Sequence, residues 1–130
     1  HKVYYGLLRK SDGDDYLDEV MVSYFAKGRS FTGEDSVEIS CHGSPAIAQM
    51  ILQELVRVGV RLAEKGEFTY RAFMNGRIDL AQAEAVLSLI QSQSALSAQQ
   101  SLRLLRGEFS EKIHTVEDLL LWALSRLEAN

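Results

Sequence analysis

The chain has 130 residues, a length typical of a single domain. Hydrophobic residues make up 46% of it, which is ordinary for a globular protein and excludes wholesale disorder. The 14 basic and 18 acidic side chains give a formal net charge of −4, which argues against an overall surface built to bind nucleic-acid phosphates.

The cysteine content indicates the cellular compartment of the protein, and the two ends of the sequence indicate its relation to a longer chain. The single cysteine, Cys41, cannot form an internal disulfide, and no Cys/His cluster has zinc-ligand spacing, so we expect a reducing, cytoplasmic setting and no metal site. No apolar run reaches the roughly 20 residues of a membrane span, and no secretory leader is visible, so no membrane partner is expected. The sequence starts at His1 rather than at Met, and a helical pattern still runs at Asn130, from which we expect a part of a longer protein.

The first 43 residues have the composition and alternation of β-strands. Residues 3–8 and 16–25 are rich in residues that suit a pleated surface, and an Asp-Gly turn signal lies between them within residues 10–15. We expect these two strands to pair as a hairpin. After a polar loop over residues 27–35, residues 36–42 alternate in polarity and predict a third strand.

The middle of the chain has helical patterns separated by glycines. Ser44 as the cap and Pro45 at the first helical position predict the start of a helix, and Gly59 predicts its end. Residues 60–63 suggest a short strand, and residues 66–75 suggest a short helix.

The last part of the chain has a longer helical pattern. Asp79 is expected to cap a helix whose apolar stripe runs over residues 80–90. Apolar residues then recur every three or four positions over residues 102–127, which is the coiled-coil period and predicts one long helix over residues 97–130. Gly107 interrupts this helix at a cost of about 1 kcal/mol relative to alanine. Such a helix would be roughly 50 Å long, so its far end is expected to pack on material outside the chain or on a second copy.

These elements together predict an α+β fold. A small mixed sheet with helices is expected over residues 1–94, followed over residues 95–130 by a long helix that begins an all-α domain.

The third predicted strand also carries candidate binding residues. Strand alternation places Val37, Ile39 and Cys41 on one face and Glu38, Ser40 and His42 on the other. The apolar face is expected to be core, and two interpretations of the polar face stay open. It is either a solvent-facing surface or a ligand platform, on which the ionised Glu38 would accept two parallel hydrogen bonds from an aminopyrimidine edge or a guanidinium.

Two arginines, Arg71 and Arg77, form a second candidate group. An arginine beside a helix start can hold an anionic or carbonyl group. The alternative is a surface ion pair with Glu67 or Asp79, which would be worth little. The chain contains no Gly-x4-Gly-Lys-Ser/Thr pattern, so the glycine-containing loop over residues 30–35 is not a phosphate loop.

Over nearly its whole length, the chain resembles the MnmE (TrmE) family of tRNA modification GTPases. The longest and most specific of the segments that carry the resemblance is residues 66–85, and the full set is residues 30–35, 37–39, 42–45, 66–85 and 102–113.

The resemblance implies a folate-binding domain of the aminomethyltransferase type, incomplete at its start, followed by the first helix of a helical domain. In the family, the N-terminal domains form a homodimer that binds a tetrahydrofolate derivative, either 5-formyl- or 5,10-methylene-tetrahydrofolate. A Ras-like domain that hydrolyses GTP with Mg²⁺ and K⁺ is inserted in the helical domain. Together with the flavoprotein MnmG, the family modifies the wobble uridine of tRNA to a 5-carboxymethylaminomethyl type.

Two folate contacts are implied residue by residue. The glutamate of the family's Gly-Glu-Asp-x-x-Glu pattern falls on Glu38, which is expected to accept hydrogen bonds from the pterin's N–H edge. The basic residue before the family's Leu-Asp-Leu falls on Arg77, a position that is often Lys, and it is expected to meet a carbonyl or carboxylate of the folate. No catalytic residue is expected in this chain, because GTP hydrolysis would belong to another part of the parent protein.

Two other functions stay open beside this one. The chain could be a helical interaction or dimerisation module without a ligand, which the apolar seam over residues 102–127 would favour. It could also be a stand-alone one-carbon transferase. The sequence offers no well-placed acid–base pair other than Glu38 and His42, which weighs against this alternative.

Overall fold

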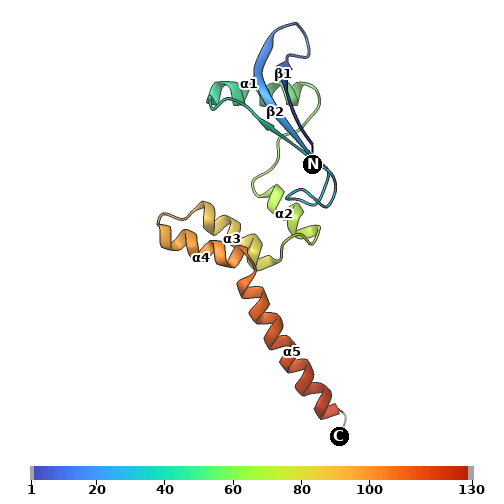
Figure 1. The fold of residues 1–130 in the computed structure, drawn as a ribbon, viewed down its shortest axis with the longest axis vertical. Coiled ribbons are helices and arrows are strands. Elements are labelled where there is room, and N and C mark those ends of the chain that lie inside the picture. The colour runs from blue at the N-terminus through green and yellow to red at the C-terminus, as the bar shows by residue number, and fades with distance from the viewer. Residues whose placement is uncertain (1, 129–130) are drawn as a thin grey trace. The chain divides into compact units, whose positions relative to one another are not determined.

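A computed structural model describes residues 2–128 of the chain, in an α+β arrangement that confirms the predicted class (Figure 1). A three-stranded sheet has the order β1-β2-β3, and both of its strand pairings are antiparallel. Its strands are β1 (Lys2–Arg9), β2 (Tyr16–Phe25) and β3 (Ser36–Ser40). The predicted hairpin is therefore confirmed, and the third strand ends two residues earlier than expected.

One face of the sheet is partly covered by a helix, and the other is open. The strand register places Val20 and Val22 of β2 on the same face as Ile39 of β3. Helix α1 (Pro45–Arg57) packs against β2, and the buried Val20 and Ile51 form the small core between helix and sheet. The large apolar side chains that alternate to the other face are more than half exposed: Val3, Tyr5, Leu7 and Met21.

Helix α1 begins where the sequence predicts, but without the predicted side-chain cap. Ser44 has extended backbone angles at the N-cap position and Pro45 is the first helical residue, yet the Ser44 hydroxyl makes no capping hydrogen bond. Gly59 follows the helix with a φ of +97°, which favours glycine. The short strand predicted over residues 60–63 is wrong: these exposed residues form no strand and pair with none in the described part of the chain.

Four further helices follow along the chain. Helices α3 and α4 pack side by side, and each starts with a capping box, centred on Asp79 and Ser94 respectively. Asp79 therefore caps its helix as predicted. The four helices are α2 (Glu67–Met74), α3 (Leu80–Ile90), α4 (Ala95–Leu105) and α5 (Glu108–Glu128).

The single long helix predicted over residues 97–130 is wrong, because the chain breaks it at Gly107. This residue has a φ of +86°, a left-handed conformation that ends α4 before α5 begins (Figure 1). The side-chain amide of Gln82 donates to the carbonyl of Leu105 at 2.8 Å, which satisfies one of the free carbonyls at the end of α4. Ser110, in the first turn of α5, donates to the carboxylate of Asp79.

The chain forms two compact units that divide between Arg71 and Ala72, and each is described here by itself. The N-terminal unit holds the sheet, α1 and α2 up to Arg71, and the C-terminal unit holds the end of α2 and the helices that follow. These units are defined by contacts within the chain and do not test the predicted boundary between domains at residues 94 and 95, which stays a prediction. None of the helices in residues 2–128 combines the length and apolar character needed to span a bilayer.

Candidate functional site

Glu38 lies on the open face of the sheet, as the strand alternation predicts. It sits in the middle of β3, directly opposite Ser23 of β2, and Ser40 follows it on the same face. The side chain is exposed, and among residues 2–128 its carboxylate has no hydrogen-bond or ion-pair partner. Its four lone-pair positions are therefore available to a ligand.

His42 does not continue this polar row. It lies beyond the end of β3, where its Nδ1 is 2.7 Å from one oxygen of Asp18 and its backbone N–H donates to the other at 2.7 Å. These bonds, with the backbone one foremost, hold the pKa of Asp18 below its usual range. Because the ionised carboxylate can only accept, Nδ1 of His42 donates in this contact. The pairing of Glu38 and His42 as an acid–base couple is thus not supported.

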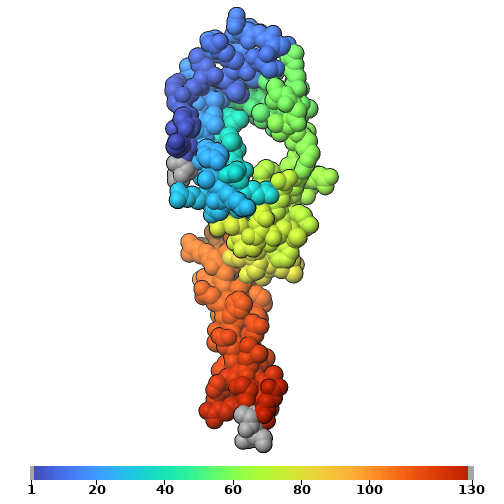
Figure 2. Space-filling model, turned by 90° about the vertical axis from the view of Figure 1, so that its right-hand side faces the viewer, coloured from blue at the N-terminus to red at the C-terminus, as the bar shows by residue number. Residues whose placement is uncertain are grey.

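A hollow of about 350 Å³ opens in the N-terminal unit between the start of β3 and the segment that follows α1. Figure 2 shows it as an opening bordered by the cyan residues of β3 and the green residues after α1. Its walls combine apolar side chains with hydroxyls, carboxylates and two guanidinium groups. They are formed by Thr32, Glu34, Asp35, Ser36, Val37, Val60, Arg61, Ala63, Glu67, Phe68 and Arg71.

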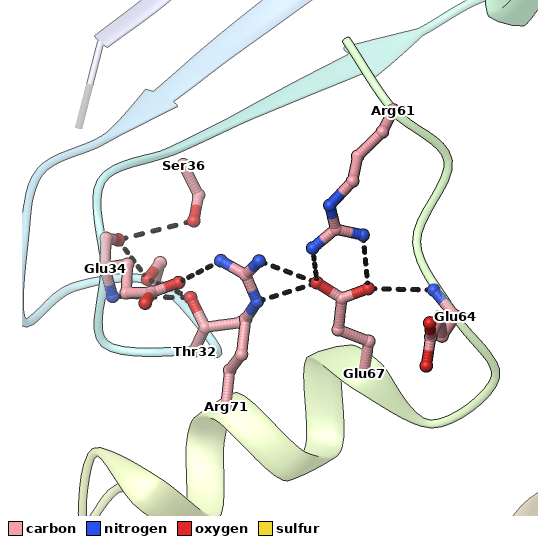
Figure 3. Close-up of polar contacts among 8 residues, drawn as sticks. Thr32, Glu34, Ser36, Arg61, Glu64, Glu67 and Arg71 are labelled. Atoms are coloured by element: carbon pink, nitrogen blue, oxygen red, sulfur yellow. Dashed lines mark hydrogen bonds and ion pairs between the residues drawn. The ribbon is translucent and has the colours of Figure 1, made fainter.

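An ion-pair clamp centred on Glu67 crosses the polar side of this hollow (Figure 3). We use this name for Glu34, Arg61, Glu67 and Arg71. Arg61 donates to both oxygens of Glu67, at 2.8 and 2.5 Å, and the backbone N–H of Glu64 donates to Oε2 at 2.8 Å. Arg71 donates to Oε1 through Nε at 3.0 Å and Nη2 at 2.6 Å. The Glu67 carboxylate thus accepts five hydrogen bonds.

The clamp also reaches the loop before β3. Arg71 Nη1 donates to Oε2 of Glu34 at 3.0 Å, so this arginine bridges two carboxylates. The loop itself is held by two buried hydroxyls: Ser30 donates to the carbonyl of Glu34 at 2.5 Å, and Thr32 accepts from the Glu34 N–H at 3.3 Å. Ser36, at the start of β3, also donates to the Glu34 carbonyl, at 3.3 Å.

The contacts of the clamp shift the pKa values of its central carboxylate and of both its arginines. Hydrogen bonds from Arg61, from the Glu64 N–H and from Arg71 hold the pKa of Glu67 far below its usual range. Hydrogen bonds to Glu34, the larger cause, and to Glu67 raise the pKa of Arg71 above its usual value. Because both guanidinium groups already face carboxylates, the hollow is not built as an anion site.

Arg77 lies just after α2, in the C-terminal unit. Gly76 has a φ of +65°, and the backbone N–H of Arg77 donates to the carbonyl of Ala72 at 2.9 Å, which closes the helix. The guanidinium is exposed and has no partner within residues 2–128. The ion pair with Asp79 that remained an alternative does not form, since Asp79 caps α3 and accepts from Ser110. Glu38 lies in the N-terminal unit and Arg77 in the C-terminal unit.

Sequence reasoning found part of this site. It placed Glu38 on the polar face of its strand, and it offered the Arg71–Glu67 ion pair as one alternative. It missed Arg61 and Glu34 as partners of this pair. Glu34 lies 37 residues from Arg71 in the sequence, and no local pattern signals a contact at that separation.

No metal centre is evident in the part of the chain that the structure describes. No three His, Cys, Asp or Glu side chains of residues 2–128 are grouped so that they could hold an ion.

Comparison with known proteins places these features in a family. The family described as "GTP-binding protein TrmE N-terminus" matches residues 1–77. The tRNA modification GTPase MnmE of Bdellovibrio bacteriovorus is 56% identical over 130 residues, which are 100% of this chain and 27% of the relative. The proteins of the same name from Christiangramia forsetii and Pseudomonas putida are 50% and 47% identical over 90% and 91% of this chain.

The chain spans about a quarter of the length of these relatives, covering 25% of the Christiangramia protein and 26% of the Pseudomonas protein. The match to the whole chain at more than half identity, together with the matching family domain, confirms the resemblance found in the sequence. The chain belongs to the MnmE (TrmE) family of tRNA modification GTPases and corresponds to its N-terminal part.

Proposed function

We propose that the chain is the folate-binding and dimerising portion of a GTPase that acts with MnmG on the wobble uridine of tRNA in the cytoplasm. Its relatives are named tRNA modification GTPases, which supports the tRNA and GTP parts of this proposal. Residues 1–94 would form the folate-binding domain and residues 95–130 would begin the helical domain. GTP, Mg²⁺ and K⁺ would be bound elsewhere in the parent protein, since these residues contain no phosphate loop.

The observation that carries the folate part is the unengaged carboxylate of Glu38 on an open, largely apolar sheet face. A flat heteroaromatic ring can lie on the exposed Tyr5 and Met21 side chains of this face, while Glu38 accepts its N–H groups. The derivative fits the residues present, either as 5-formyl- or as 5,10-methylene-tetrahydrofolate, and would supply the one-carbon unit. Arg77, exposed and unpaired within residues 2–128, would meet a carbonyl or carboxylate of the same ligand.

Calorimetric titration of 5-formyl-tetrahydrofolate into the chain tests this assignment. We expect binding by the wild type, none measurable by Glu38→Ala, and wild-type affinity for Ser40→Ala, which alters the next residue on the same face. Equal binding by the wild type and Glu38→Ala would remove Glu38 from the site. Weaker binding by Arg77→Met would support contact between Arg77 and the same ligand.

A second candidate is an interaction or dimerisation module that needs no ligand, and helix α5 favours it. No residue of Glu108–Glu128 is buried, and the helix exposes a continuous apolar seam. The seam consists of Phe109, Ile113, Val116, Leu120, Leu124 and Leu127. Sedimentation over a range of concentrations tests it: a constant monomer mass would remove this candidate and also the dimerising part of the first proposal, and would leave the folate-binding part.

A further inference from the structure

The ion-pair clamp is not used by the proposed contacts at Glu38 and Arg77, and its geometry indicates a role of its own. Arg71 engages all three of its guanidinium nitrogens, two with Glu67 and one with Glu34. Glu67 and Arg71 lie on α2, whereas Glu34 lies on the loop before β3. Arg71 therefore ties this loop to α2, as Figure 3 shows.

Arg61 provides an internal comparison. It makes a two-pronged contact with the same Glu67 carboxylate, and its remaining hydrogen bond, from Nη1 at 3.1 Å, goes to the carbonyl of Leu62 in its own segment. Two arginines thus share one carboxylate, and within residues 2–128 Arg71 alone of the two reaches the loop.

The loop that Arg71 holds leads directly into the strand of the proposed site. Its backbone at Glu34 is fixed by Ser30 and Thr32, and Ser36, two residues before Glu38, bonds to the same Glu34 carbonyl. The loop and the start of β3 also form one wall of the hollow. A shift of Glu34 would therefore move Ser36 and the start of β3, two residues before Glu38.

We propose that Arg71 is a positioning residue for the folate site: by bridging Glu67 and Glu34, it holds the loop over residues 30–36 and thereby fixes the start of β3, the strand that carries Glu38. This inference rests on the proposed folate function. Arg71 does not contact the ligand in this role; it acts through the loop.

Two lysine variants, Arg71→Lys and Arg61→Lys, distinguish the effect of the contact between Arg71 and two carboxylates from the effect of the positive charge. Lysine keeps the positive charge, but its single nitrogen cannot reproduce the planar, forked contacts that join two carboxylates. Arg71→Lys is therefore expected to release the loop, whereas Arg61→Lys, which also weakens contact with Glu67, leaves the loop in place. We expect about five-fold faster amide hydrogen exchange over residues 30–36 in Arg71→Lys than in Arg61→Lys, as for loss of a half-exposed ion pair.

The second measurement is the affinity for 5-formyl-tetrahydrofolate, recorded with the melting temperature of each variant. We expect about five-fold weaker binding by Arg71→Lys than by Arg61→Lys at matched melting temperatures, which a merely structural role would not produce. Faster loop exchange together with weaker binding supports the inference. Unchanged exchange over residues 30–36 overturns it whatever the affinity, and faster exchange with unchanged affinity also overturns it.

The two measurements also separate this inference from the proposed function. If the wild type binds no folate while Arg71→Lys still loosens the loop, the folate assignment has failed, and the positioning role fails with it although the clamp itself is real.

Discussion

Replacement of Gly107 by alanine is predicted to lower the free energy of unfolding of the C-terminal unit by about 1 kcal/mol. The φ of +86° at this residue is a left-handed conformation, which costs an L-amino acid with a Cβ roughly 1–2 kcal/mol. A Cβ at this position would meet the Gln82 Nε2 atom at 3.6 Å, an ordinary contact, so steric overlap adds nothing. The loss of unfolded-state freedom offsets roughly 0.4–1 kcal/mol of the strain.

Two other glycines serve as matched controls. Gly59 has a φ of +97° and open space around it, so Gly59→Ala is expected to destabilise the chain by a similar amount. Gly43 also has open space but no left-handed φ, so Gly43→Ala is expected to be neutral or slightly stabilising. Urea unfolding followed by far-ultraviolet circular dichroism measures all three variants.

The result that would refute this reasoning is a Gly107→Ala variant that gains helix and loses no stability. It would mean that an unbroken helix through residues 95–128 is accessible, and that the break does not depend on the left-handed conformation of glycine.

Three further predictions concern individual polar contacts. Hydrogen bonds, foremost from Arg61, hold the pKa of Glu67 below its ordinary value. The stability that ionised Glu67 contributes is therefore present at neutral pH and is lost as the pH falls below about 4.5. In Glu67→Gln, the melting temperature should fall less steeply with decreasing pH below this value. Asp79→Ala should cost about 1 kcal/mol in urea unfolding and Asp79→Asn less, because asparagine also caps helices well. His42→Ala should raise the pKa of Asp18, measured by carboxyl NMR titration, and an unchanged value would contradict the paired geometry.

Local signals predicted most of the secondary structure. The hairpin followed from an Asp-Gly turn between two apolar strands, and the start of α3 followed from Asp79, whose side chain accepts from the N–H of Gln82 at 2.8 Å. These features depend on residues within a few positions of one another, which is why a single sequence reveals them.

The break at Gly107 could not be read from periodicity, because the apolar spacing continues through it without a change of phase. A glycine inside a helix costs only about 1 kcal/mol, which alone does not decide between a straight and a broken helix. The broken form gains contacts with a distant segment: Gln82 bonds to the Leu105 carbonyl and Ser110 bonds to Asp79. Such contacts, 23 and 31 residues apart in the sequence, decide the outcome.

The candidate site shows the same contrast. Strand alternation was enough to place Glu38 on the open face, and helical spacing was enough to pair Glu67 with Arg71 at i and i+4. The link from Arg71 to Glu34 depends on how the loop over residues 30–36 folds back through its buried hydroxyls.

Apolar surface links the fold to the proposed assembly. Among residues 2–128 the buried hydrophobic side chains are Val20, Ile51, Ala72 and Ala85, whereas both the open sheet face and all of α5 expose large apolar groups. Most of the stability of a helix in a protein comes from packing of its apolar face, so the 21-residue α5 is expected to gain stability when a partner covers its stripe. Folate on the sheet face would cover only a small part of this area, so the proposed ligand binding and the proposed association do not exclude one another.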